Sequence, residues 1–301
     1  MTLTDQCIEI DTLPEFRFAE QVAFLRLAPL DCLYTVAANA IYKAIRVSRG
    51  PAILKVSATA ADKLAVMYSG PAGEGLLAET VKQYVVEWFN LDTNISPFYT
   101  MAKTDRLLAP LAEQYRGLYI VGIPDLFEAI AWAIIGQQIN LTFAYQLKRR
   151  FTQSFGEQFT SEGRQYWLFP LPEVVAGLQV GDFLPLQFSR QKAVYLIGAA
   201  QAIMSNQLSK EKLLQEPGLS AMKSRLMNLK GVGEWTADYV LLKCLRQLTA
   251  FPVGDAGLQN AVKSGLAMAK KPTATELQHL AEPWQGWEAY ATFYLWRSLY
   301  T

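Results

Sequence analysis

Strand-like patterns dominate roughly the first ninety residues of the chain. Residues 40–59, AIYKAIRVSRGPAILKVSAT, place two β-branched runs on either side of the turn signal SRGP and predict a hairpin. Residues 62–70, DKLAVMYSG, predict a further strand. Residues 73–91 then carry apolar side chains at helical intervals and predict a helix behind these strands.

Helical periodicity takes over from about residue 94. The segment from Pro124 to Gly156 opens with a proline and an aspartate, a typical helix start, and closes at a glycine, a typical helix end. A later helix is predicted behind Ser189, whose hydroxyl suits an N-cap. Helical spacing continues to the C-terminus, so we expect an all-helical segment.

The change of pattern predicts an α+β protein of two domains. Pro97 and the polar stretch before it mark the boundary. We assign residues 1–93 to a small N-terminal antiparallel-sheet domain and residues 94–301 to an all-α domain. The chain has 301 residues, of which 51% are hydrophobic and 18% charged, which is enough to give two domains a core.

Composition narrows the classes of function. No apolar run approaches the roughly 18 residues that a membrane span needs, and the N-terminal MTLTDQCIEIDTLPEF lacks a basic-then-apolar leader pattern. We therefore expect a cytoplasmic protein with no membrane partner. The net charge is only +1, so a nucleic-acid function would need a locally basic face. The candidates for that face are Lys148, Arg149, Arg150, Arg190, Lys192, Lys223 and Lys230.

Cysteine and histidine are too few for several kinds of site. Cys7, Cys32 and Cys244 form no CxxC pair, no disulfide framework and no four-cysteine cluster. His279 is the single histidine of the sequence, which disfavours histidine metal sites and Ser-His-Asp or Cys-His catalysis. Acid–base chemistry in this chain therefore falls to carboxylates.

Residues 229–242, LKGVGEWTADYVLL, combine two glycines with an immediate helix start. Gly231 and Gly233 can adopt positive φ and leave backbone N–H groups uncovered. The helix that starts at about Glu234 points its N-terminal amides at whatever the turn faces, and a phosphate suits such a site. Taken alone, the motif has an alternative explanation, a Gly-bearing turn that only packs two helices together.

Other motifs accompany this turn in a fixed order. FEAIAWAIIGQQIN and SRQKAVYLIGAA precede it, FPVGDAGLQNAV places Asp255 22 residues beyond Gly233, and PWQGWEAYATFYLW comes last. In order and spacing, the set resembles the helix–hairpin–helix DNA glycosylase superfamily, and within it the 3-methyladenine DNA glycosylase II type. The likeness covers about residues 118–300, and FRFAEQVAFLR extends it into the N-terminal domain.

The resemblance implies removal of a damaged base from double-stranded DNA in base excision repair. Asp255 matches the catalytic aspartate, whose carboxylate would stabilise an oxocarbenium-like sugar and orient the attacking water. Capping of the helix that follows is the alternative role for Asp255. Family members that also cut the strand carry a lysine where this chain has Trp235, so the resemblance implies a monofunctional hydrolase without lyase activity.

An aromatic pocket for the flipped base is expected, because electron-rich rings bind flat and cationic bases such as alkylated purines. The predicted pocket residues are Trp235, Tyr239, Tyr290, Trp296 and, through the N-terminal likeness, Phe24. Trp284 and Trp287 are expected in the core.

The resemblance also implies the DNA contacts. The predicted DNA-binding residues are Gln137, Gln138, Gly231, Val232, Gly233 and Thr236. Gln138 aligns best with the residue that fills the space left by the flipped base, and Gln137 remains the alternative. In relatives, hairpin carbonyls hold a monovalent cation against a phosphate; here these are the carbonyls of Met227, Leu229 and Val232. No other cofactor is expected, and the family likeness implies a monomer.

Two other functions stay open at this point. Helix–hairpin–helix motifs also occur in proteins that only hold DNA, although Asp255 and the Trp/Tyr-rich last helix argue against that class. An oxidised-purine glycosylase of the same superfamily is disfavoured by Trp235 at the lysine position. The sequence does not rank 3-methyladenine against 7-methylguanine or other damaged purines.

Overall fold

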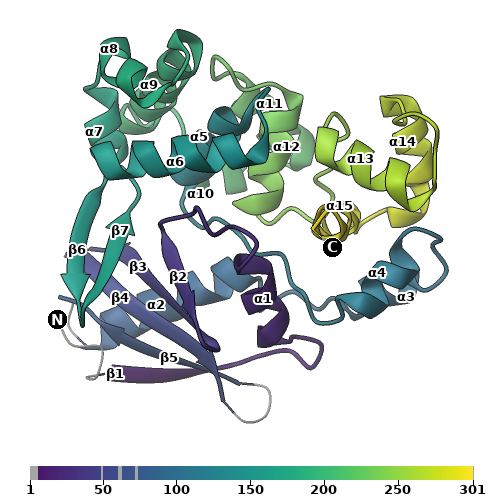
Figure 1. Ribbon diagram of the computed structural model, residues 1–301, viewed down its shortest axis with the longest axis horizontal. Coiled ribbons are helices and arrows are strands. Elements are labelled where there is room, and N and C mark those ends of the chain that lie inside the picture. Colours follow the sequence, from purple (N-terminus) through teal and green to yellow (C-terminus); the bar gives the residue numbers. More distant parts are fainter. Residues whose placement is uncertain (1–5, 49, 60–62, 72–73, 301) are drawn as a thin grey trace.

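The computed structural model describes residues 6–48, 50–59, 63–71 and 74–300 (Figure 1). It confirms the α+β class, with an antiparallel sheet in the N-terminal part and helices in the remainder. The strands are β1 (Gln6–Asp11), β2 (Tyr34–Ala37), β3 (Ala40–Val47), β4 (Gly50–Ala58), β5 (Lys63–Ser69), β6 (Glu157–Ser161) and β7 (Arg164–Leu168). The helices of the N-terminal part are α1 (Phe18–Leu25) and α2 (Glu74–Phe89).

The remaining helices follow one another from residue 96 onward. They are α3 (Ser96–Ala102), α4 (Leu108–Gln114), α5 (Leu126–Gly136), α6 (Leu141–Phe155), α7 (Pro172–Ala176), α8 (Val180–Phe183), α9 (Arg190–Met204), α10 (Lys210–Leu214), α11 (Leu219–Met227), α12 (Glu234–Lys243), α13 (Ala256–Gly265), α14 (Ala274–Leu280) and α15 (Glu288–Ser298), with 3-10 turns η1 (Leu184–Leu186) and η2 (Glu282–Trp284).

The N-terminal sheet is antiparallel in the order β1-β5-β4-β3-β2. The predicted hairpin is confirmed, since β3 pairs with β4 from Ala40 opposite Ser57 to Val47 opposite Gly50. One face of the sheet, including Leu54 and Val56, belongs to the same buried core as Val81 and Val85 of α2. Helix α1 lies between this sheet and α15 (Figure 1).

The part of the chain that was predicted to be all-helical also contains two strands, which corrects that prediction. Strands β6 and β7 form a hairpin whose turn residues, Glu162 and Gly163, both have positive φ (49° and 72°). Its Tyr166 and Leu168 bury the second sheet face, at Ala44 and Ile53. The hairpin therefore joins the two parts of the molecule by closing over the side of the sheet that α2 leaves open (Figure 1).

Helix starts in the helical part follow the capping residues that the sequence indicates. Asp125 caps α5 by accepting from the Glu128 amide, and Ser189 caps α9 by accepting from the Lys192 amide. Helix α5 ends at Gly136, and the next helix, α6, begins after Asn140, which caps it. This break between α5 and α6 places Gln137 and Gln138 at an exposed turn.

One continuous buried core runs from Ile10 to Leu295 and includes both parts of the molecule. The expected boundary at residues 93/94 falls between α2 and α3 and stays a prediction. Trp284 is fully buried and Trp287 packs partly buried against the same core, as predicted. Among the described helices, none is both long and apolar enough to cross a membrane.

Candidate active site and nucleic-acid interface

Asp255 stands at the start of α13 and binds three N–H donors. Its Oδ1 accepts from the Leu258 amide at 2.6 Å and from the Trp296 indole Nε1 at 2.8 Å. Its Oδ2 accepts from the Trp235 indole Nε1 at 2.7 Å. The helix cap that was considered as the alternative role of Asp255 is therefore present, but it is only one of the three hydrogen bonds to the carboxylate. The two indole N–H groups make the other two bonds and hold the carboxylate in one orientation.

Three of the predicted pocket residues gather beside this carboxylate. Trp235 and Tyr239 lie one turn apart on α12, and their ring centroids are 5.8 Å apart. Tyr239 and Trp296 of α15 are also separated by 5.8 Å. The last helix and the helix after the hairpin thus present one aromatic wall whose two indoles both bond to Asp255.

A second group of aromatic residues, which the sequence analysis missed, supports this wall from behind. The Trp132 indole Nε1 donates to the Tyr239 hydroxyl at 2.8 Å. The Trp132 ring also packs on Tyr145 at 4.7 Å between centroids. Trp132 stands on α5 and Tyr145 on α6, so no local pattern connects either to the motif around Trp235.

Lys148 completes the support and is not part of a DNA-facing surface, which corrects its inclusion in the basic face. Its ammonium lies 5.3 Å from the centroid of the Trp132 ring. It pairs with Asp31 at 2.9 Å and with Glu128 at 3.0 Å, and its side chain is 5% exposed. A buried ammonium needs such partners, because an unpaired buried charge is strongly unfavourable.

The pKa shifts in this ion network follow from burial and pairing. Burial raises the pKa of Asp31, but the charge of Lys148 and the hydrogen bonds from Lys148 and the Leu33 amide outweigh it and hold the pKa below its usual value. Burial lowers the pKa of Lys148, but Asp31 and Glu128 raise it above its usual value. Both groups are charged at neutral pH.

Tyr290 does not belong to the pocket, which corrects its prediction as a pocket residue. It is fully buried and packs against Phe98 and Tyr119 at centroid distances of 5.6 and 6.4 Å. On α15 it lies six residues before Trp296, and this spacing turns the two side chains to different sides of the helix. Helical spacing alone gave no indication of which side faces the core.

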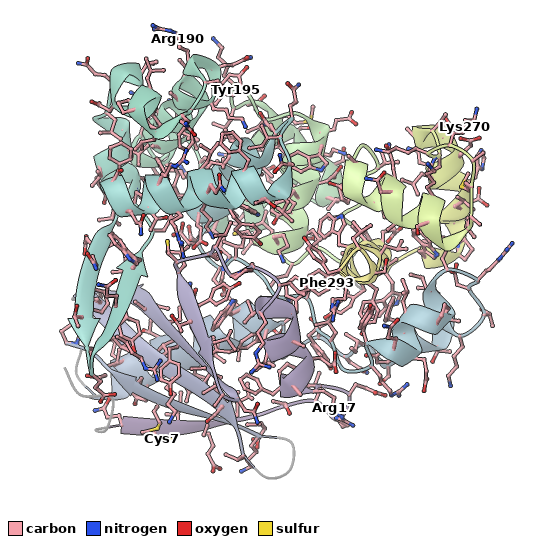
Figure 2. The ribbon with its side chains drawn as sticks, in the orientation of Figure 1. Cys7, Arg17, Arg190, Tyr195, Lys270 and Phe293 are labelled. Atoms are coloured by element: carbon pink, nitrogen blue, oxygen red, sulfur yellow. The ribbon has the colours of Figure 1, made fainter. Side chains whose placement is uncertain are left out.

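Phe24 packs on the last helix, α15. Its ring packs at 4.8 Å on Phe293, which stands at the contact between α1 and α15 (Figure 2). Lys243, one turn after Tyr239, places its ammonium 4.9 Å from the Phe293 centroid and 5.8 Å from that of Phe24. Phe24 therefore shares its surroundings with a lysine that the sequence gave no reason to select, and its place in the base pocket stays a prediction.

The hairpin between α11 and α12 has two glycines in different roles. Gly231 has φ +89°, and a Cβ there would lie 2.2 Å from the ring of Tyr195 on α9. The predicted positive φ is therefore present at Gly231, together with a close approach. Gly233 has an extended backbone, caps α12 and has open space where a Cβ would project.

Gln137 and Gln138 occupy different environments although they are neighbours. The Gln137 side-chain amide donates to the Gly231 carbonyl at 2.8 Å and to the Thr236 hydroxyl at 2.9 Å. Gln138 has φ +57° and is exposed. Gln137 thus ties the α5–α6 turn to the hairpin, and this leaves Gln138 as the side chain at the open surface.

A polar cavity of about 360 Å³ joins these elements. It is lined by Gln137, Gln138, Ser189, Gln191, Lys192, Tyr195, Gly231, Val232 and Gly233. The predicted DNA-binding residues therefore share one concave surface, except Thr236, which lies buried behind it and bonds to Gln137. Arg190 extends outward at the far end of α9, beyond Tyr195 (Figure 2).

The carbonyls proposed for a monovalent cation fit that role in part. The Leu229 carbonyl already accepts from the Val232 amide at 3.1 Å. The carbonyls of Met227 and Val232 accept no backbone hydrogen bond within the described part of the chain. Hard monovalent cations bind oxygen ligands of this kind, so these two carbonyls have free lone pairs to offer. Side-chain metal clusters of three or more His, Cys, Asp or Glu are absent from the described residues.

Comparison with known proteins identifies the family. The model of the HhH-GPD superfamily of base excision DNA repair proteins matches residues 131–286, just over half of the chain. The chain belongs to this superfamily. A second model, the 8-oxoguanine DNA glycosylase N-terminal domain, matches residues 31–130. The family likeness expected from the hairpin motifs is thereby confirmed.

Relatives and solved structures agree with this family. The chain is 41% identical to "DNA-3-methyladenine glycosylase" of Bacillus subtilis over 96% of each chain. It is 28% identical to "DNA-3-methyladenine glycosylase 2" of Escherichia coli over 60% of each. Its fold is similar to that of the 3-methyladenine DNA-glycosylase from Archaeoglobus fulgidus, with a TM-score of 0.84, 24% identity and coverage of 96% and 97% of the two chains.

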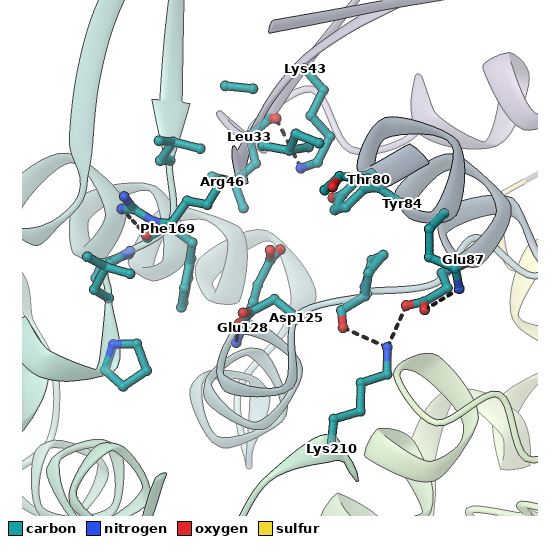
Figure 3. A pocket seen from close by; sticks show the side chains of 18 of the residues that line it. Leu33, Lys43, Arg46, Thr80, Tyr84, Glu87, Asp125, Glu128, Phe169 and Lys210 are labelled. Carbon is teal, nitrogen blue, oxygen red and sulfur yellow. Dashed lines mark hydrogen bonds and ion pairs between the residues drawn. The ribbon is translucent and has the colours of Figure 1, made fainter. Parts of the chain in front are cut away.

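A second cavity of this HhH-GPD protein, about 710 Å³, is lined by neither Asp255 nor the hairpin. Figure 3 shows this cavity. It opens between β3, α2, the start of α5 and the segment after β7. Lys210 crosses it to reach Glu87 at 2.6 Å and the Pro124 carbonyl at 2.9 Å. None of the predicted site residues lines it, so its volume does not mark the base pocket.

Proposed function

We propose that this base excision repair protein is a monofunctional glycosylase that flips alkylated purines out of duplex DNA and hydrolyses the bond between base and sugar. The observation that carries the proposal is the Asp255 carboxylate, held by two indoles of one aromatic wall next to the helix–hairpin–helix turn. The names of similar proteins in Bacillus subtilis and Escherichia coli, both 3-methyladenine glycosylases, support alkylated bases as substrates.

The polar cavity is the surface on which we place the duplex. Backbone amides of Gly231, Gly233 and the start of α12 would bind a phosphate, since a helix N-terminus favours anions. The carbonyls of Met227, Leu229 and Val232 would hold a monovalent cation beside that phosphate, Leu229 with the lone pair that the Val232 amide leaves free. Gln138, exposed at the turn, would enter the space that the flipped base leaves and offset part of the few kcal/mol of unpairing.

The aromatic wall would receive the flipped base. Stacking on Trp235, Tyr239 and Trp296 favours flat rings, and a cationic purine gains about 0.5–2 kcal/mol per aromatic face. An alkylated purine already carries the positive charge that makes it a good leaving group. The site therefore needs no strong general acid, in agreement with a chain that has a single histidine.

Asp255 would act on the sugar rather than on the base. As the bond to the base breaks, positive charge develops at C1′, and a fixed carboxylate stabilises it without reorganising. The same carboxylate can orient a water molecule for attack on C1′. Trp235 offers no amine for a Schiff base, so the products are the free base and an abasic site, with the strand intact.

The test is incubation of the protein with methylated duplex DNA, followed by identification of the released bases. We expect 3-methyladenine or 7-methylguanine in solution, no strand scission, and no covalent adduct after borohydride reduction. Release of 8-oxoguanine with strand cleavage would favour the oxidised-purine alternative, and binding without release would favour a DNA-holding protein. Sedimentation of the free and DNA-bound protein would test the proposed monomer.

A further inference from the structure

The hydrogen bond between Trp132 and Tyr239 has only one direction. An indole Nε1–H donates and has no lone pair to accept with, so the Tyr239 oxygen must be the acceptor of this 2.8 Å bond. The hydroxyl hydrogen of Tyr239 is therefore left over. A phenol oxygen that already accepts one bond is polarised to donate more strongly.

This hydroxyl hydrogen has no acceptor among the residues that the structure describes, and Tyr239 is partly buried. Burial raises the pKa of the phenol well above its usual value, so the hydrogen stays on the oxygen at any working pH. A buried donor without a partner is costly, by the same reasoning that makes buried polar groups almost always paired. Its partner must come from outside the protein.

The orientation of the Trp132 side chain is fixed by the groups around it. The Lys148 ammonium lies over the indole ring, and Tyr145 packs on it. Lys148 is in turn held by Asp31 and Glu128. This packing keeps the Trp132 side chain in place and its Nε1–H aimed at Tyr239.

The Tyr239 hydroxyl lies on the side of the wall where the base, and not the sugar, is expected. The ring of Tyr239 packs between Trp235 and Trp296, whose indoles bond to Asp255, while its hydroxyl reaches toward Trp132 on α5. A nucleotide with its sugar at Asp255 and its base on this wall therefore turns the far edge of the base toward the hydroxyl.

We propose that Tyr239 is a specificity-determining donor whose hydroxyl hydrogen bonds to an acceptor atom on the far edge of the flipped base. The inference rests on the proposed glycosylase function. It favours purines with a carbonyl oxygen at position 6, as in 7-methylguanine, over those with an exocyclic amine there, as in 3-methyladenine, because an amine presents hydrogens to a donor.

The experiment compares Tyr239→Phe with the unaltered protein on methylated duplex DNA, measuring single-turnover release of both bases from the same substrate. Phenylalanine keeps the ring and removes the hydroxyl. We expect the ratio of 7-methylguanine to 3-methyladenine release to fall about three- to tenfold, the range for one neutral hydrogen bond. Trp132→Phe removes the indole N–H that donates to the Tyr239 hydroxyl, and it should also lower this ratio.

The double variant Tyr239→Phe/Trp132→Phe should show no further fall in the ratio, because Trp132 acts through the hydroxyl. Tyr34→Phe is the matched control: it removes a hydroxyl that bonds the Leu25 carbonyl at 3.0 Å, and should leave the ratio unchanged. A Tyr239→Phe ratio within twofold of the unaltered protein, or a raised ratio, would overturn the inference while both bases are still released. Release of neither base by the unaltered protein would instead overturn the proposed function.

Discussion

Asp255 combines structural and chemical roles at a single side chain. Its Oδ1 caps α13 and accepts an indole, and its Oδ2 accepts a second indole. Asp105 has a comparable set of donors away from the site, with Oδ1 accepting from the amides of Leu107 and Leu108 and Oδ2 from the Trp284 indole at 2.7 Å. The two carboxylates therefore form a natural pair for separating fold from chemistry.

We expect Asp255→Asn to lower single-turnover base release by at least about 100-fold, the scale of losing one fixed electrostatic contact to the transition state, while duplex affinity stays within about threefold. Asp105→Asn should cost similar stability and leave base release unchanged. Thermal unfolding and base release would be measured on both variants. Substantial release by Asp255→Asn would remove this residue from the catalytic role.

Gln137 and Gln138 provide a second test at the level of single residues. Gln138→Ala should slow release from paired duplexes and slow it less when the damaged base is mispaired, because less pairing is lost on flipping. Gln137→Ala should slow both substrates alike, since it frees the Gly231 carbonyl and the Thr236 hydroxyl. The measurement is the single-turnover rate of each variant on the paired and the mispaired substrate. Equal losses on both substrates for Gln138→Ala would mean that Gln138 does not fill the vacated space.

Individual residues show where sequence reasoning ends. The sequence left Gln137 and Gln138 as alternatives, and only the side-chain bonds of Gln137 separate them. Tyr290 was a wrong prediction because periodicity shows that a helix has an apolar side but not which neighbour covers it. Trp132 was missed because its bond to Tyr239 spans 107 positions in the chain.

The elements themselves were easier to predict. Local signals determine a helix start, so Asp125 and Ser189 were identifiable as caps without any tertiary information. The β6–β7 hairpin was missed although its Glu162-Gly163 turn has the positive φ angles of a tight hairpin. Its strands are short, and what stabilises them is burial of Tyr166 and Leu168 on a sheet more than a hundred residues earlier.

The helix–hairpin–helix turn gives a prediction for an element as a whole. Gly233 has open space for a side chain, so Gly233→Glu should fold normally and place a negative charge where a phosphate is expected. Affinity should fall by a similar factor for several unrelated duplexes, since phosphate contacts carry no sequence information. Gly233→Gln is the matched neutral variant and should bind more tightly than Gly233→Glu. Loss confined to one duplex sequence would contradict the phosphate role.

At the scale of the whole molecule, Lys243 lies where the N-terminal part meets the helices. Its ammonium donates to the Val121 carbonyl between the rings of Phe24 and Phe293. Burial, with a contribution from the charge of Lys148, lowers the pKa of Lys243 to about 7. The unfolded chain, whose lysines titrate near 10.4, therefore binds more protons than the folded protein between pH of about 7 and 10.

Folding stability should consequently rise with pH across that window, because the unfolded state is the one that holds the extra proton. Lys243→Met should remove this dependence and stabilise the protein by a few kcal/mol at pH 6, with a gain that shrinks toward pH 10. Denaturant unfolding at several pH values measures it. Lys270→Met, at an exposed position (Figure 2), is the control and should show no such trend. A gain independent of pH would mean that the pKa of Lys243 is not lowered in the folded protein.

The ion pair between Asp31 and Lys148 has a consequence for modularity. Asp31 belongs to the N-terminal part, whereas Lys148, Glu128 and Trp132 belong to helices α5 and α6. A fragment limited to residues 94–301 would lose one of the two carboxylates that hold this buried ammonium beneath the aromatic wall. In this chain the sheet is therefore part of the support of the aromatic wall, and the helical fragment alone is expected to unfold at a lower denaturant concentration than the whole protein.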